Sequence, residues 1–173
     1  MPGKIDATLA VVLTCSIAVL TDLRSRRIPN WLTLSSLILA IAAVPWSQSL
    51  PGSLAALAVY IPFFIVGWLG GGDVKLLMAL GAWGGAGFAL DTAINSIVIG
   101  GLLGLFALLV RGTLMDFFRR LWKFVRSIVY RELEMEAFKA DPRSRLPFAI
   151  PMAIAAIGRI YGRIPGVQEW FGR

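Results

Sequence analysis

The chain has 173 residues, of which 57% are hydrophobic and 16% are charged. So few charged residues cannot cover a water-soluble globule of this length, and the composition is typical of a protein dissolved in lipid. The net charge of +7 is carried by residues that lie between apolar runs, not on a basic face with interleaved aromatic residues, so nucleic acid is not predicted as a partner.

Six apolar stretches follow one another along the chain. Each is near the length of about 20 residues that a helix needs to cross a membrane, and helices are expected because lipid offers no partner to unpaired backbone groups. The alternation of apolar and polar residues that marks a transmembrane barrel is absent. The sequence therefore predicts an all-α, polytopic membrane protein, one domain over residues 1–173. The predicted helices cover about residues 5–21, 31–46, 53–69, 74–90, 92–110 and 146–164.

Lys and Arg residues are distributed unevenly among the short connections. Those near the first and third helix ends are Arg24, Arg26, Arg27 and Lys75. The connections after the second and fourth helices contain none, so the positive-inside rule makes the odd-numbered helices end in the cytoplasm and both chain ends face outward. Arg159, Arg163 and Arg173 oppose this orientation.

A long connection of about residues 111–145 is predicted to lie in the cytoplasm, because it is rich in Lys and Arg. Apolar residues recur in it at helical spacing, with basic residues between them. The apolar set is Leu114, Phe117, Phe118, Leu121, Trp122, Val125, Ile128 and Val129, and the basic set is Arg119, Arg120, Lys123 and Arg126. This pattern predicts a basic amphipathic helix between the fifth and sixth membrane helices. It would lie on anionic lipid of the inner leaflet or, alternatively, shape a substrate-docking surface.

The chain contains no histidine and a single cysteine, Cys15, which lies inside an apolar run. These absences exclude a Ser-His-Asp triad, a Cys-His pair, an HExxH zinc site and a CxxC metal site. Any hydrolytic chemistry must therefore use carboxylates, Lys or hydroxyl groups. No metal site and no cofactor are predicted.

Asp22, Asp73, Lys75 and Asp91 lie at the ends of predicted membrane helices, where the cost of burying a charge makes each a functional candidate. Taken singly, the acidic residues have simpler interpretations: Asp73 and Asp91 can cap the helices that follow them, and Asp22 can pair with the arginines after it. The predicted topology, however, puts Asp22 and Asp73 at the same cytoplasmic boundary. Two carboxylates at one depth suit general acid–base hydrolysis, because close carboxylates divide their proton affinities.

The sequences beside these carboxylates are distinctive. Three glycines at 70–72 precede Asp73, and such a run lets the backbone turn sharply and a substrate strand approach closely. After Asp22 the chain reads LRSRRIPNWL, in which Pro29 restricts the backbone and Asn30 can cap the next helix.

The GxGD pattern that ends at Asp73, followed by VKLL, resembles the active-site motif of type IV prepilin peptidases, and Asp22 with its Ile-Pro-Asn flank resembles their first catalytic aspartate. The LPFAIP stretch at 146–151 resembles the start of their last helix more loosely. The resemblance implies a GxGD membrane aspartyl protease with Asp22 and Asp73 as the catalytic pair. The residues Gly70, Gly72 and Lys75 would form the supporting motif.

The resemblance also implies a function. The enzyme would remove the short basic leader of a prepilin at the cytoplasmic side of a prokaryotic inner membrane, with Asp22 and Asp73 holding the attacking water and no metal, cofactor or covalent intermediate. Longer family members carry a cytoplasmic segment with paired cysteines and methylate the new amino terminus. This chain begins at its first helix and has one Cys, so it resembles the short form that accompanies tight-adherence (Flp-type) pili, without methyltransferase activity.

Two alternatives stay open. Lys75 either holds Asp73 in place or extends to the lipid interface. The whole chain could instead be a non-catalytic membrane carrier or secretion-machine subunit that uses Asp22 and Asp73 for proton coupling. Carriers often contain inverted internal repeats, and this sequence has none that can be recognised, which favours the protease. The predicted partners are a prepilin and membrane lipids.

Overall fold

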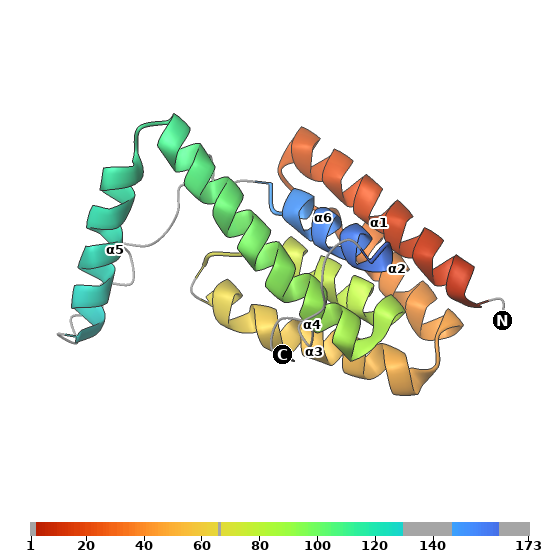
Figure 1. Cartoon of the computed structure of the whole chain (residues 1–173). Coiled ribbons are helices and arrows are strands. Elements are labelled where there is room, and N and C mark those ends of the chain that lie inside the picture. Colours follow the sequence, from red (N-terminus) through yellow and green to blue (C-terminus); the bar gives the residue numbers. More distant parts are fainter. Residues whose placement is uncertain (1–2, 66, 130–146, 163–173) are drawn as a thin grey trace.

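The computed structural model describes residues 3–65, 67–129 and 147–162, and every regular element in these ranges is an α-helix (Figure 1). The helices are α1 (Gly3–Ser25), α2 (Asn30–Ala43), α3 (Trp46–Ile65), α4 (Gly71–Val110), α5 (Leu114–Val129) and α6 (Ala149–Ile160). The predicted all-α class is confirmed. Arg163, Arg173 and the second half of the predicted cytoplasmic loop lie outside the described residues.

Helix α4 is not straight, because its backbone breaks at Gly85, where φ is 83° and ψ is 179°. A Cβ built on Gly81 would lie 3.0 Å from the Cβ of Ala89. Eight residues of a straight helix rise about 12 Å, so the two residues can meet only if the chain reverses between them. Segments 71–84 and 86–110 therefore fold back against each other, as the yellow-green and green parts of α4 show (Figure 1).

The sequence predicted two helices in this region, but the predicted boundary between them at residues 90–92 is wrong. Asp91 does not cap a helix. It lies inside the second segment of α4 and is only 8% exposed. The physical reason is that the conformation of Gly85 is almost restricted to glycine, so the chain can turn there without any capping side chain.

We expect Gly85→Ala to lower the free energy of unfolding by about 1–3 kcal/mol, because alanine is strained at this φ and ψ. Gly87→Ala is the matched control, since a Cβ on Gly87 meets nothing within 4 Å. Titration of the purified protein with SDS in mixed micelles, followed by tryptophan fluorescence, measures both. Equal stability of the two variants would contradict a strained turn at Gly85.

Other helix ends also differ from the predicted ones. Helix α3 begins at Trp46 instead of residue 53 and continues through Pro51 and Pro62, because membrane helices tolerate proline where neighbouring groups satisfy the freed carbonyls. Helix α1 continues to Ser25, so Asp22 lies within its last turns. The predicted last helix, 146–164, is shorter at both ends within the described residues, as α6 covers Ala149–Ile160.

The helices pack closely through small residues. Helix α3 lies along α4, and α6 lies against both α4 and α1. Where α3 crosses α4, a Cβ on Gly52 would overlap the carbonyl oxygen of Gly81. Close backbone approach of this kind is how helices associate in lipid, where hydrophobic burial contributes little. Gly100 also serves packing, since a Cβ on it would lie 2.6 Å from Cε2 of Phe148.

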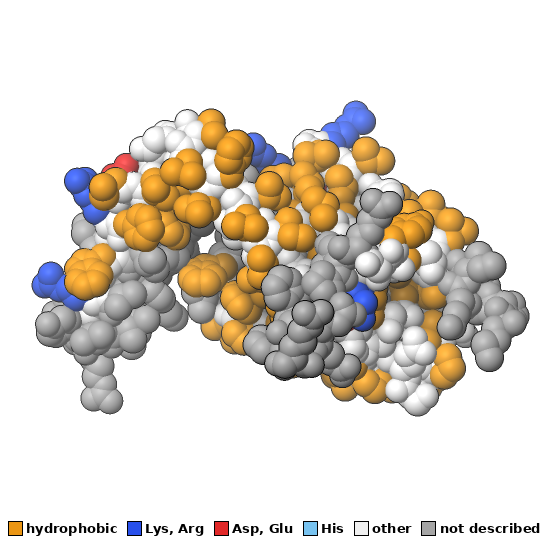
Figure 2. Space-filling model, viewed as in Figure 1, with side chains coloured by type: hydrophobic (Ala, Val, Ile, Leu, Met, Phe, Trp, Pro, Cys, Tyr) orange, Lys and Arg blue, Asp and Glu red, His pale blue; other side chains and the backbone are white. Residues whose placement is uncertain are grey.

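Hydrophobic side chains cover most of the described surface on the face shown in Figure 2, and charged ones gather mainly over α5 and at the upper end of the view. Helices α1, α3 and α4 are long and apolar enough to cross a membrane, and α2 and α6 are shorter apolar helices. So large an exposed apolar surface needs lipid around it. Together with the break in α4, this confirms a polytopic membrane protein of about six apolar helical segments.

The predicted amphipathic helix is confirmed as α5, which follows α4 after a short connection at residues 111–113. Its exposed apolar side chains include Phe117, Phe118 and Trp122, and exposed Arg119 and Arg126 accompany them. An apolar face beside basic residues suits the surface of an anionic membrane.

Candidate active site

Asp22 is a buried carboxylate, 7% exposed, near the end of α1. Its Oδ2 accepts a hydrogen bond of 3.2 Å from the backbone N–H of Ala149, the first residue of α6. The first N–H groups of a helix have no partner within the helix and carry a partial positive charge, which suits a carboxylate. The start of α6 therefore orients the Asp22 side chain, although the two residues are 127 positions apart.

Asp73 lies at the third position of α4 and caps the start of that helix from there, as its simpler interpretation predicted, although it is not itself the N-cap residue. Gly70 is the N-cap residue, and the Oδ2 of Asp73 accepts a 3.0 Å hydrogen bond from its backbone N–H. A Cβ on Gly70 would lie 3.2 Å from that oxygen, so a side chain there would crowd the carboxylate. The GxGD turn thus holds the carboxylate from its own backbone.

The segment after Asp22 packs directly on the segment around Asp73. A Cβ built on Gly72 would lie 3.2 Å from the Cβ of Ile28, so this glycine makes room for the α1–α2 connection. The Nζ of Lys75 donates a 3.0 Å hydrogen bond to Oδ1 of Asn30, the first residue of α2. Neither predicted role of Lys75 includes this contact, which ties α4 to α2.

A second set of contacts joins the start of α6 to α3 and α4 through the core. Phe148, next to Ala149, packs edge-on against Tyr60 of α3, with ring centroids 6.2 Å apart. Tyr60 is fully buried, and its hydroxyl lies 2.6 Å from Oγ of Ser96 in the second segment of α4. The start of α6, which bonds to Asp22, is therefore also attached to α3 and α4.

Through these contacts the ends of four helices lie together. They are the last turns of α1 and the first turns of α2, α4 and α6. The supporting residues Gly70, Gly72 and Lys75 all lie in this region and contact Asp73, Ile28 and Asn30. Asp91 is not part of it. Asp22 and Asp73 both belong to this region, which suits a reaction that needs one ionised and one protonated carboxylate.

Neither Tyr60 nor Ser96 was predicted to support the site. The sequence contains one signal for Tyr60, because a phenol inside an apolar helix needs a hydrogen-bond partner. It indicates Phe148 and Ala149 only as part of the LPFAIP stretch. Their spatial link to Asp22 is a tertiary contact without a local pattern.

A family model described as the type IV leader peptidase family matches residues 9–105, a range that contains both Asp22 and Asp73. A curated relative, the prepilin leader peptidase/N-methyltransferase of Xanthomonas campestris pv. campestris, is 32% identical over an alignment of 118 positions that covers 60% of this chain and 41% of that protein. The chain thus spans less than half the length of that relative. No solved structure matches the chain.

Proposed function

The chain belongs to the type IV leader peptidase family, and we propose that it is an aspartic endopeptidase that removes the short basic leader of a type IV prepilin. The observation that carries the proposal is the packing of the Asp22 segment on the GxGD turn, with Gly72 against Ile28 and Lys75 bonded to Asn30. This packing supports a shared site for the two carboxylates within the region that matches the family.

In the proposed mechanism, Asp22 and Asp73 hold a water molecule between them. One carboxylate takes a proton as the water attacks the scissile carbonyl, and the other, protonated, donates to the carbonyl oxygen. The pair titrates as a unit, so acid and base are roles of the dyad and not of one residue. The Ala149 and Gly70 N–H groups orient the two side chains.

We place the site at the cytoplasmic side of the inner membrane, with both chain ends outside. The arginines after Asp22 support this orientation, because basic residues concentrate in cytoplasmic connections. Within the prepilins, we extend the proposal to the Flp-like class, on the resemblance to the short family form alone. A substrate of this kind would insert its apolar helix beside the enzyme and keep its basic leader in the cytoplasm.

Co-expression with a tagged prepilin tests the proposal. An Flp-like and a longer type IV prepilin are each expressed in a host without its own leader peptidase, and mass spectrometry reads the new amino terminus. We expect the wild-type chain to shorten the Flp-like prepilin and the Asp22→Asn/Asp73→Asn double variant to leave it intact. Absence of cleavage by a wild-type chain that accumulates in the membrane would contradict the proposal. Proton-dependent uptake into vesicles by that same chain would then favour the carrier.

A further inference from the structure

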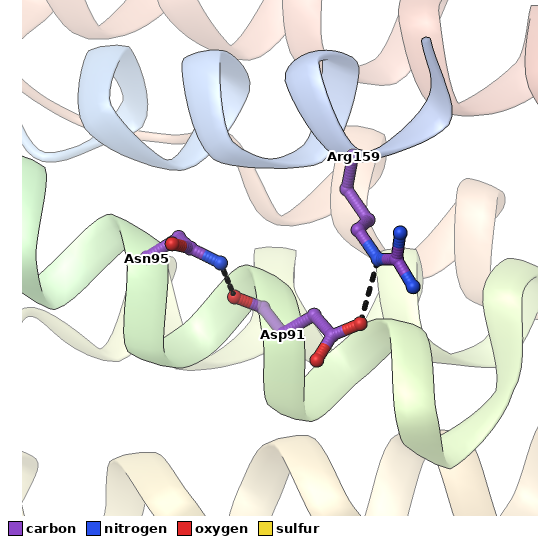
Figure 3. Close-up of polar contacts among 3 residues, drawn as sticks. All are labelled: Asp91, Asn95 and Arg159. Atoms are coloured by element: carbon purple, nitrogen blue, oxygen red, sulfur yellow. Dashed lines mark hydrogen bonds and ion pairs between the residues drawn. The ribbon is translucent and has the colours of Figure 1, made fainter. Parts of the chain in front are cut away.

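An ion pair joins α4 to α6 away from the two carboxylates of the proposed site (Figure 3). Asp91 of α4 is 8% exposed, and its Oδ2 lies 2.7 Å from Nε of Arg159, in the last turn of α6. The side-chain amide of Asn95 donates a 2.8 Å hydrogen bond to the backbone carbonyl oxygen of Asp91. Burying a charge within a membrane helix costs free energy unless the charge is paired. The ion pair between Asp91 and Arg159 therefore offsets the cost of placing both residues in apolar helices.

Helix α6 carries both the ion pair and the contact to Asp22. Ala149 at its start donates to Asp22, and Arg159 lies ten residues later, which corresponds to about 15 Å along the helix. A single short helix therefore links the two contacts as one rigid element.

Alanine dominates the buried face of α6. Its buried residues are Ala149, Pro151, Met152, Ala153, Ala155 and Ala156, of which only Met152 has a long side chain. The four alanines let α6 approach α4 and α1 closely, and each of them interlocks less with its neighbours than a large side chain would. A charge-assisted hydrogen bond has a preferred length and direction, so it can add to packing in setting the position of α6 along α4.

We infer that the Asp91–Arg159 pair fixes α6 along α4 and thereby keeps the Ala149 N–H on the Asp22 carboxylate. The inference rests on the proposed function in one respect, namely that Asp22 is catalytic. Asp91 and Arg159 are then positioning residues, since they act on Asp22 through α6 and do not touch the reacting atoms. The pair also removes one objection to the predicted orientation, because the Arg159 charge on the outer side is compensated by Asp91.

The position of α6 is measured without any substrate. Nitroxide labels on Leu20→Cys of α1 and Ile154→Cys of α6, in a Cys15→Ala background, report the spacing of the two helices in lipid nanodiscs by pulsed electron resonance. Both label sites are exposed, at 67% and 47%. We expect a narrow distance distribution in the otherwise unchanged chain and a broadened or displaced one in Asp91→Asn and Arg159→Gln. Arg159→Lys, which keeps the charge, should restore most of the narrow distribution.

The same variants are assayed for leader cleavage. We expect kcat to fall about 10- to 100-fold in Asp91→Asn and Arg159→Gln with little change in KM, because the misplacement affects a reacting group and not substrate binding. Arg159→Lys should lie near the wild type. Asp116→Asn is the matched control: it removes the exposed Asp116–Arg119 pair of α5 and should change neither the distances nor kcat.

An unchanged distance distribution in both Asp91→Asn and Arg159→Gln overturns the inference, and so does a changed distribution with kcat at the wild-type value. If Asp91→Asn does not accumulate, the comparison of Arg159→Gln with Arg159→Lys decides in the same way. If the wild-type chain cleaves no prepilin, the proposed function fails, while the distance measurements still decide whether the pair positions α6.

Discussion

Asp22→Asn and Asp73→Asn are each expected to lower the rate of leader cleavage by about 10²- to 10⁴-fold, the range that a positioned acid or base contributes. Asparagine cannot exchange a proton at neutral pH, so either substitution removes half of the acid–base cycle. The same loss is expected for every prepilin that the wild-type chain cleaves, because the chemistry at the scissile bond does not depend on the leader.

The structure makes asparagine the informative replacement. Its side-chain oxygen can still accept the hydrogen bond from Ala149 at position 22, and the one from Gly70 at position 73. The start of α6 and the GxGD turn should therefore keep their geometry. Activity lost in a variant with normal membrane accumulation and thermal stability then reflects the missing carboxylate and not an unfolded site.

The double variant sharpens the test. Residues that act as one unit lose their effect together, so Asp22→Asn/Asp73→Asn should be about as inactive as either single variant. Initial rates on a purified prepilin in detergent give the three values, with Asp116→Asn as a charge-matched control at an exposed ion pair. If either single variant cleaves at the wild-type rate, the dyad is wrong. If the two losses multiply, the carboxylates work independently.

Much of this architecture could be predicted because it follows from solvation. Apolar runs of membrane length require helices in lipid, and the uneven distribution of Arg and Lys predicts the sides on which they end. The prediction that Asp22 and Asp73 share one boundary followed from the predicted topology. The contacts of Gly72 with Ile28 and of Lys75 with Asn30 agree with it.

The turn inside α4 could not be located from composition. Residues 81–87 contain four glycines, and only the positive φ of Gly85 distinguishes the one at which the chain reverses. Asp91 followed by Thr92 imitates a helix start, and that local pattern competed with the glycine run and produced the wrong boundary.

The pairing of Asp91 with Arg159 could have been predicted more readily than the position of the turn in α4. The predicted topology put Asp91 and Arg159 at the same outer side, one as an unexplained acid and the other as a violation of the positive-inside rule. Opposite charges that share a membrane depth tend to pair. By contrast, the hydrogen bond from Ala149 to Asp22 depends on the tertiary position of α6, and no periodicity or motif chemistry contains that information.

Gly52→Ala is expected to cause the largest loss of stability among single-methyl additions to the described helices, about 2–3 kcal/mol or more. A Cβ at this position would overlap the carbonyl oxygen of Gly81 and lie 3.0 Å from the carbonyl carbon of Gly85. Both are backbone atoms, so no side-chain rotation can relieve the contact. Helices α3 and α4 must separate, and the many contacts along their crossing weaken together.

Gly101→Ala is the matched control, since it adds the same methyl group to the exposed second segment of α4, where a Cβ meets nothing within 4 Å. It should stabilise the helix by about 0.5–1 kcal/mol, because alanine loses less backbone entropy than glycine. SDS titration of both variants gives the difference. A Gly52→Ala chain as stable as Gly101→Ala would mean that α3 and α4 are not held at backbone contact. The close crossing would then not be what supports the first segment of α4, which carries Asp73.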